Sequence, residues 1–188
     1  MDKSILIIGA PRSGKTTLAK KIAKKEGAGL INIDNIVTAF EAYPELKITH
    51  NDVVNLEKKL SPFLKLYFNE LLSGFFYPEI KYVFESSYVD FETVIPFLQH
   101  SKGARIEIIG LTYNLLNEDE LFNCIRKYDD SKYDWTARRD DEQLRQIVRE
   151  LVKINQTFAQ KFKEYHIRNF DTSFNREEVF AKIMAELT

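Results

Sequence analysis

The chain has 188 residues, of which 44% are hydrophobic and 29% are charged, and its formal net charge is −1. This composition is typical of one soluble globular domain over residues 1–188, and it gives no reason to expect a nucleic-acid or membrane surface. The single cysteine, Cys124, excludes an internal disulfide, and the three histidines lack the spacing of a zinc site. No apolar run approaches the roughly 20 residues that span a bilayer, so we expect a cytoplasmic protein.

The first element predicted is a strand at residues 4–8, an apolar run typical of a strand buried on both faces. Residues 9–16, named here the phosphate loop, read GAPRSGKT and match the pattern G-x-x-x-x-G-K-[ST]. Residues 16–26 then carry apolar side chains at helical spacing. Strand, loop and helix in this order are the context that the motif requires. The alternative is a glycine turn between a core strand and a core helix.

Each fixed position of the loop has a physical reason. Gly9 and Gly14 allow a tight turn that brings backbone N–H groups to phosphate oxygens. Lys15 supplies positive charge to the β and γ phosphates, and the Thr16 hydroxyl can ligate magnesium. We therefore predict a site for ATP and Mg²⁺. The residues expected to bind the nucleotide here are Gly9, Ala10, Pro11, Arg12, Ser13, Gly14, Lys15, Thr16 and Thr17.

Downstream, short strand-like runs alternate with longer helical ones, which predicts an α/β protein with a mainly parallel sheet. The strands are expected at residues 30–33, 80–84, 105–111 and 165–170, and the helices at residues 35–43, 62–73, 118–126, 142–163 and beyond 175. Asp52 can cap a helix that begins at residues 53–54, and the pair Ser61–Pro62 predicts the start of the next helix. Asn175 with Glu178 predicts a capping box.

Carboxylates occur where two of these strands end. Ligands of a parallel sheet bind at the carboxyl ends of its strands, so Asp34, Glu85 and the turn at residues 171–173 are candidates. Asp34 can accept the proton of an attacking hydroxyl or hold a substrate group, or it can cap the next helix. Glu85 can support magnesium beside Thr16, or it can cap the following turn.

Basic residues surround a polar stretch at residues 127–141 that contains Trp135. Phosphoryl transfer needs positive charge around the moving group and exclusion of water. Arg126, Arg138 and Arg139 are therefore candidate catalytic residues of a closing lid, together with Lys15 and Asp34. The alternative is a solvated surface loop.

Residues 9–17 after an N-terminal strand resemble the P-loop small-molecule kinase superfamily, which includes adenylate, nucleoside monophosphate, shikimate and gluconate kinases. The resemblance implies a three-layer α/β fold with a five-stranded parallel sheet in the order 2-3-1-4-5 and helices on both faces. It also implies an acceptor-binding helical segment at about 35–74 and a small lid at about 127–141.

The same resemblance assigns roles to single residues. Asp34 corresponds to the acidic substrate-binding position, and Arg126 to an arginine that contacts nucleotide phosphates. Asp171 and Thr172 lie where the adenine ring is bordered. The chain departs from the pattern after the third strand, where it reads FESS instead of the DGFPR of adenylate kinases. It also lacks the glycine triplet of shikimate kinases and a four-cysteine zinc site.

These features favour a magnesium-dependent phosphotransferase that moves the γ-phosphoryl group of ATP to a small acceptor, which is a nucleotide, a nucleoside or another hydroxyl metabolite. Two alternatives remain, a P-loop NTPase acting as a switch or motor and a non-catalytic nucleotide-binding module. The segment at residues 35–74 lacks an arginine cluster for a second phosphate, which tilts the interpretation slightly away from a monophosphate acceptor. The alternative is that Arg12 and the lid arginines supply that charge. The acceptor and the oligomeric state are not determined by the sequence.

Overall fold

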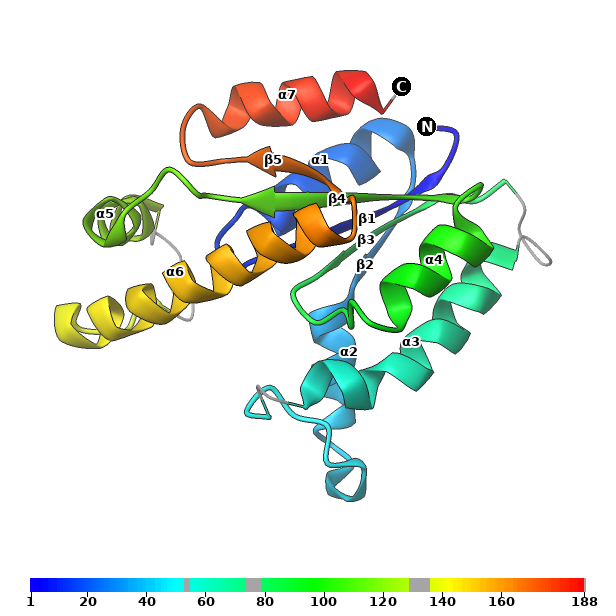
Figure 1. Cartoon of the computed structure of the whole chain (residues 1–188), viewed down its shortest axis with the longest axis horizontal. Coiled ribbons are helices and arrows are strands. Elements are labelled where there is room, and N and C mark those ends of the chain that lie inside the picture. The colour runs from blue at the N-terminus through cyan, green and yellow to red at the C-terminus, as the bar shows by residue number, and fades with distance from the viewer. Residues whose placement is uncertain (53–54, 74–78, 129–135, 188) are drawn as a thin grey trace.

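The computed structural model describes residues 1–52, 55–73, 79–128 and 136–187. Its strands form one parallel sheet in the order β2-β3-β1-β4-β5 with helices around it (Figure 1), which confirms the predicted fold class and strand order. The strands are β1 (Ser4–Gly9), β2 (Gly29–Asn32), β3 (Tyr82–Ser86), β4 (Ile106–Thr112) and β5 (Arg168–Asp171). The helices are α1 (Lys15–Glu26), α2 (Ile33–Phe40), the 3₁₀ turn η1 (Pro44–Leu46), α3 (Leu56–Ser73), α4 (Val94–Lys102), α5 (Glu118–Tyr128), α6 (Asp141–Glu164) and α7 (Arg176–Glu186).

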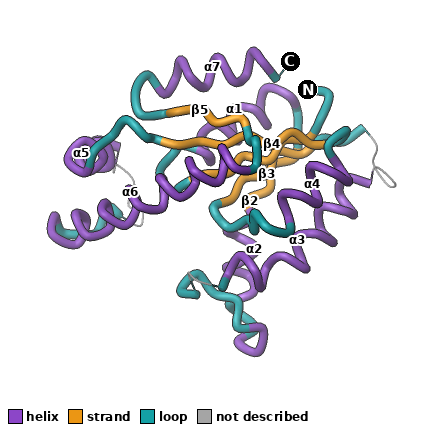
Figure 2. Tube along the Cα trace, in the orientation of Figure 1, coloured by secondary structure: helices purple, strands orange, loops and turns teal. Residues whose placement is uncertain are grey.

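The two faces of the sheet are covered by different helices (Figure 2). Along β1, Ile5 and Ile7 belong to the apolar cluster that includes α1 and α7. Leu6 and Ile8 belong to the second cluster, which includes α3, α4 and α6. All four side chains are buried, which explains why the strand reads as an uninterrupted apolar run.

The phosphate loop leaves the middle of the sheet because β1 lies between β3 and β4. In the strand register, Ile8 pairs with Ser86, and Gly9 pairs with Leu111. The neighbouring pair of β2 and β3 places Asn32 opposite Glu85. The carboxyl ends of β2 and β3 therefore lie beside the loop, which is where a parallel sheet binds its ligands.

The boundary between β2 and α2 differs from the prediction. Strand β2 ends at Asn32, and Asp34 lies in the first turn of α2 rather than at the end of a strand. The N-cap is Asn32, whose side chain accepts hydrogen bonds from the backbone N–H groups of Asp34 at 2.7 Å and Asn35 at 3.3 Å. The interpretation of Asp34 as the cap was therefore wrong, because Asn32 already occupies that position.

Helix α3 begins earlier than the prediction, and Pro62 lies inside it rather than in its first turn. Proline in a helix interior costs about 3 kcal/mol because it removes a backbone hydrogen bond. The apolar stripe of Leu56, Leu60, Leu64 and Phe68 continues past Pro62 and is fully buried, and this burial offsets the cost. Asp52 Oδ1 accepts from the backbone N–H of Asn55 at 3.2 Å. The start predicted at residues 53–54 lies outside the described residues.

Four further features differ from the prediction. Glu85 lies inside β3, which runs two residues further than expected. Helix α4 was not predicted, and β5 begins at Arg168 rather than at residue 165, because α6 extends to Glu164. The capping box at Asn175 does not form: this residue has a left-handed backbone with φ 49°, and its side chain makes no cap hydrogen bond.

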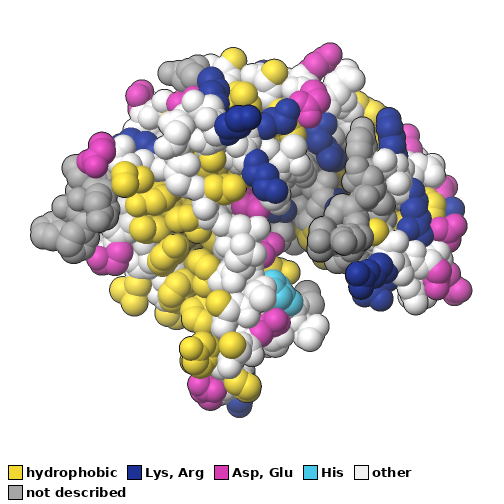
Figure 3. Space-filling model, turned by 180° about the vertical axis from the view of Figure 1, so that it is seen from behind, with side chains coloured by type: hydrophobic (Ala, Val, Ile, Leu, Met, Phe, Trp, Pro, Cys, Tyr) yellow, Lys and Arg dark blue, Asp and Glu magenta, His cyan; other side chains and the backbone are white. Residues whose placement is uncertain are grey.

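The back of the molecule carries hydrophobic side chains in one continuous area and lysines and arginines in a separate one (Figure 3). Exposed large hydrophobic residues of the described chain include Leu30, Tyr43, Leu66 and Ile80. Within the described residues, none of the helices has both the length and the apolar character needed to cross a membrane.

Candidate active site

The backbone of the phosphate loop has the conformation that its glycines predict. Gly14 has φ 92°, a left-handed value that glycine adopts without strain, and a Cβ there would lie 2.8 Å from the ring of Phe180. At Gly9, with φ 156°, a Cβ would lie 2.2 Å from the carbonyl oxygen of Leu111. Substitution of either glycine would therefore displace the loop from the helices and strands that hold it.

The loop is held by side chains from two other segments, those that follow β5 and β4. The Thr172 hydroxyl, which follows β5, lies 2.9 Å from the carbonyl oxygen of Ser13 and is fully buried. The Tyr113 hydroxyl, which follows β4, lies 3.1 Å from the carbonyl oxygens of Pro11 and Leu151. Because Leu151 belongs to α6, Tyr113 joins the loop to that helix. Burial raises the pKa of Tyr113, so its hydroxyl stays protonated and able to donate.

Lys15 is buried at the start of α1, and its ammonium group donates to the carbonyl oxygen of Ala10 at 2.9 Å. Burial lowers its pKa, while the negative charges of Asp34 and Glu85 raise it in opposition. Lys15 makes one hydrogen bond among the described residues, and a buried ammonium group of this kind can exchange that carbonyl for phosphate oxygens. This arrangement is the one expected of the lysine in a phosphate loop.

Thr16 and Glu85 meet as the sequence predicted. The Thr16 hydroxyl lies 2.8 Å and 3.0 Å from the two carboxylate oxygens of Glu85, and Asn32 Nδ2 donates to Glu85 Oε1 at 2.7 Å. Burial raises the pKa of Glu85, and the hydrogen bond from Thr16 and the charge of Lys15 lower it. These are hard oxygen donors at a helix start, and they fit a magnesium ion that is held partly by phosphate and water.

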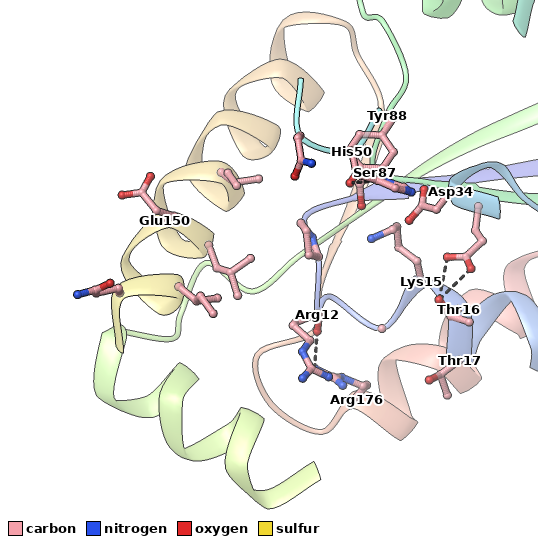
Figure 4. A pocket seen from close by; sticks show the side chains of 18 residues that line it. Arg12, Lys15, Thr16, Thr17, Asp34, His50, Ser87, Tyr88, Glu150 and Arg176 are labelled. Carbon is pink, nitrogen blue, oxygen red and sulfur yellow. Dashed lines mark hydrogen bonds between the residues drawn. The ribbon is translucent and has the colours of Figure 1, made fainter. Parts of the chain in front are cut away.

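Asp34 faces Lys15 across the hollow beside the loop (Figure 4). Its Oδ1 is buried and has no hydrogen-bond partner among the described residues. Burial raises the pKa of Asp34, and the charge of Lys15, the Ser87 backbone N–H and His50 lower it. A buried carboxylate oxygen without a partner is costly unless a ligand satisfies it. Asp34 is therefore the strongest sign of a bound polar group.

These residues line a cavity of about 1030 Å³, named here the main cavity. Its walls come from the phosphate loop, from the carboxyl end of β3 and from the first turn of α2. The far wall consists of the α6 residues Gln146, Ile147, Glu150, Leu151 and Ile154. Ligand pockets are about 300–1,000 Å³ in volume. The main cavity is thus large enough for a nucleotide and a part of a second molecule.

The predicted lid arginines are not among the described residues that line the main cavity. Arg126 donates to Asp141 Oδ1 at 2.7 Å and to the Arg139 carbonyl at 2.8 Å, and it lies 5.6 Å from the ring centre of Phe122. Arg138 and Arg139 are exposed at the start of the segment before α6. Most of the predicted lid, including Trp135, lies outside the described residues. A role for these arginines in a closing lid stays a prediction.

Asp171 and Thr172 also have structural partners. Asp171 accepts from the backbone N–H groups of Asn114 at 2.8 Å and Ser173 at 2.9 Å, which fixes the turn after β5. Neither is among the residues that line the main cavity in the described part of the chain. Their expected position beside an adenine ring stays a prediction, while Thr172 visibly supports the loop.

Sequence reasoning did not identify several residues of the cavity. Arg176 begins α7, donates to the Arg12 carbonyl at 3.2 Å and lines the main cavity (Figure 4). His50 and Tyr88 also line it, with His50 Nδ1 3.3 Å from the Tyr88 hydroxyl. A signal existed only for Arg176, a basic residue that follows the last strand by a few positions. The other two come from loops that no motif marks.

Comparison with solved structures places the fold among known proteins. The chain resembles a shikimate kinase from Bacteroides thetaiotaomicron, with a TM-score of 0.59 and 15% identity over 98% of each chain. It resembles a gluconokinase from Sinorhizobium meliloti, with a TM-score of 0.57 and 16% identity over 99% of this chain and 95% of the other. A sugar kinase from Janibacter is similar with a TM-score of 0.61, 12% identity and coverage of 100% and 95%.

No protein-family profile matches the sequence, and no curated protein sequence matches it. The structural likeness therefore rests on the fold, at identities well below 25%. The predicted resemblance to P-loop small-molecule kinases is confirmed at the level of the fold.

Proposed function

We propose that the chain is a phosphotransferase that moves the γ-phosphoryl group of ATP, with Mg²⁺, to a hydroxyl of a small molecule in the cytoplasm. The observation that carries the proposal is the position of Asp34. Its partnerless carboxylate oxygen faces the main cavity beside Lys15 and the pair of Thr16 and Glu85. A nucleotide-binding loop alone does not require a buried carboxylate at this position, whereas transfer to a hydroxyl does.

The nucleotide phosphates are bound by groups that the loop already presents. Its backbone N–H groups and the N-terminus of α1 attract phosphate oxygens, and Lys15 supplies a full positive charge. The buried Ser13 Oγ has no hydrogen-bond partner among the described residues and can donate to phosphate. Arg12 and Arg176 add charge at the side of the main cavity nearest α7.

A magnesium ion fits the oxygen donors Thr16 Oγ1 and Glu85, directly or through water. When bound, it neutralises charge on the β and γ phosphates. Asn32 orients the Glu85 carboxylate and caps α2 with the same amide group. One side chain therefore sets the positions of both carboxylates, Glu85 and Asp34.

The proposed transfer makes one bond to the γ phosphorus and breaks one. The acceptor oxygen forms a bond to the γ phosphorus, the bond from that phosphorus to the β–γ bridging oxygen breaks, and ADP leaves. Asp34 accepts the proton of the acceptor hydroxyl, and Lys15 stabilises the charge that develops on the transferred group. Asp34 must therefore be ionised at the start of the transfer.

The experiment that tests this function is ATP consumption with Mg²⁺ against a panel of nucleoside monophosphates, nucleosides and hydroxylated metabolites. A no-acceptor control and the variant Lys15→Ala accompany it. Turnover that depends on one class of acceptor and is lost in Lys15→Ala supports the proposal. Acceptor-independent hydrolysis would instead indicate an NTPase, and nucleotide binding without turnover would indicate a binding module.

A further inference from the structure

A second, smaller cavity adjoins the main one. It has a volume of about 290 Å³ and is named here the side chamber. Both cavities are lined by Pro11, His50, Ser87, Tyr88 and Ile154, so they share a wall. Since Pro11 belongs to the phosphate loop, a molecule in the side chamber lies next to the place where the γ phosphate is bound. The volume suits a small acceptor.

Two opposite charges line the side chamber. Glu57 on α3 and Lys161 on α6 are both half-buried, and no ion pair joins them to each other in the described part of the chain. Glu57 has no hydrogen-bond partner of its own among the described residues. Burial raises the pKa of Glu57, and the charge of Lys161 lowers it. Half-buried charges that face a cavity without a direct partner are satisfied when a polar ligand enters.

The floor of the side chamber is aromatic. Phe91 and Phe158 pack edge to face with ring centroids 5.9 Å apart, and Lys161 Nζ lies 4.8 Å from the ring centre of Phe91. The Tyr88 ring, held by His50, forms the wall toward the main cavity. Phe91 and Phe158 are both buried, and Lys161 covers the Phe91 ring, so the two rings give the side chamber an apolar floor rather than an exposed stacking face.

The charges in the side chamber do not favour an acidic acceptor. Carboxylates and phosphates are usually recognised by arginines, which donate two parallel hydrogen bonds. No arginine lines the side chamber among the described residues, and its single lysine is opposed by Glu57. Asp34 adds a second carboxylate on the side of the main cavity. The positive charges of the main cavity, Lys15, Arg12 and Arg176, are those assigned above to the nucleotide phosphates, so the side chamber itself offers an acidic acceptor one lysine opposed by one carboxylate.

We propose that the acceptor is an uncharged ring-bearing alcohol that binds between Glu57 and Lys161. This inference rests on the proposed function and names the substrate class of that site. An N–H or O–H group of the ring donates to Glu57, and an oxygen or nitrogen accepts from Lys161. The reacting hydroxyl points past Tyr88 to Asp34. Nucleosides and cyclic polyols share this chemistry.

The test compares matched neutral and acidic acceptors. ATP consumption and calorimetric binding are measured with nucleosides against their monophosphates, and with glucose and inositol against glucuronate and shikimate. We expect the neutral member of each pair to be preferred by about tenfold or more, as the loss of one charged contact implies. A preference for nucleosides or for polyols identifies which source of the shared chemistry is used.

Variants of the two charges show whether the side chamber causes the preference. In Glu57→Gln, kcat/KM for the neutral acceptor is expected to fall by about tenfold while the KM for ATP stays unchanged. Glu57→Lys is expected to shift preference toward the acidic member by about 100-fold. Glu45→Gln, an exposed change on η1, is the matched control. If a Glu57 variant does not fold, Lys161→Met tests the same chamber and should disfavour acids further.

The outcomes separate the two proposals. Preference of the wild type for acids or monophosphates, or selectivity that Glu57→Lys leaves unchanged, would overturn the neutral acceptor and leave the phosphotransferase standing. If no acceptor of either kind increases ATP consumption, the phosphotransferase itself fails, and the acceptor class fails with it.

Discussion

The phosphate loop and the junction between α5 and α6 both concentrate basic residues, and among the described residues the loop charges line the main cavity whereas Arg126, Arg138 and Arg139 do not. At the loop, Lys15 is buried and faces Asp34 and Glu85. At the junction, Arg126 is engaged by Asp141 and by the Arg139 carbonyl, on the surface. The difference follows from position in the fold. The loop follows a central parallel strand, whereas the junction connects two helices. Charge alone therefore does not mark a site.

The largest effect is expected for Lys15→Ala. It removes the charge that faces the phosphates, and loss of one such group typically lowers kcat by about 100- to 1,000-fold. Steady-state ATP turnover is the measurement, and Lys24→Ala on the exposed side of α1 is the control. Near-normal turnover in Lys15→Ala would remove the functional distinction between the two regions.

Asp34→Asn should lower turnover by about 100-fold or more, because the proton acceptor is lost. Affinity for ATP, measured by calorimetry, should stay nearly unchanged. If ATP affinity collapses instead, Asp34 belongs to the nucleotide or metal site or to the fold rather than to the acceptor.

The pH dependence follows from the same carboxylate. Burial raises the pKa of Asp34 above its ordinary value of 3.8. As the pH is lowered, turnover should therefore begin to fall at a higher pH than it would with an ordinary aspartate. The stability effect has the opposite sign. A raised folded pKa contributes stability below the unfolded pKa that is lost as pH rises through the folded pKa. The Tm of Asp34→Asn relative to wild type should therefore rise across that interval, as thermal melts at several pH values will show.

A smaller effect is expected for Glu85→Gln. The variant keeps the shape of the side chain but loses its charge beside Thr16, and such changes around a metal ligand typically cost about 10- to 100-fold in metal affinity. Titration of turnover with MgCl₂ measures this shift. Unchanged Mg²⁺ dependence would mean that Glu85 only positions Thr16 and Asn32.

The smallest effect is expected for Arg126→Ala. The contact with the exposed Asp141 is a surface ion pair, worth about 0.2–1 kcal/mol in the free energy of unfolding, and turnover should change little. Denaturant unfolding and steady-state turnover are measured together, with Arg149→Ala on the exposed side of α6 as the control. A loss of turnover near 100-fold would show instead that Arg126 reaches the transferred phosphate, which is the role that the sequence predicts for it in a closing lid.

Much of the fold could be predicted because its signals are local. The apolar run of β1 and the glycines of the loop specify strand, turn and helix within residues 4–26, and the long amphipathic pattern specifies α6. The boundaries that failed depended on distant contacts. Pro62 stays inside α3 because the stripe on both sides of it is buried against the sheet. Asn32 caps α2 while it also bonds to Glu85 from the neighbouring strand.

The candidate site divides in the same way. The sequence by itself located the phosphate loop and singled out Lys15, Thr16, Asp34 and Glu85, whose roles stay predictions, because motif spacing and strand ends are properties of adjacent residues. Only the tertiary structure decided that α6 forms the far wall, that Arg176 lies beside the loop, and that Glu57 faces Lys161 across a chamber. These residues come from segments far apart in the chain, and only the packing of helices on the sheet brings them together.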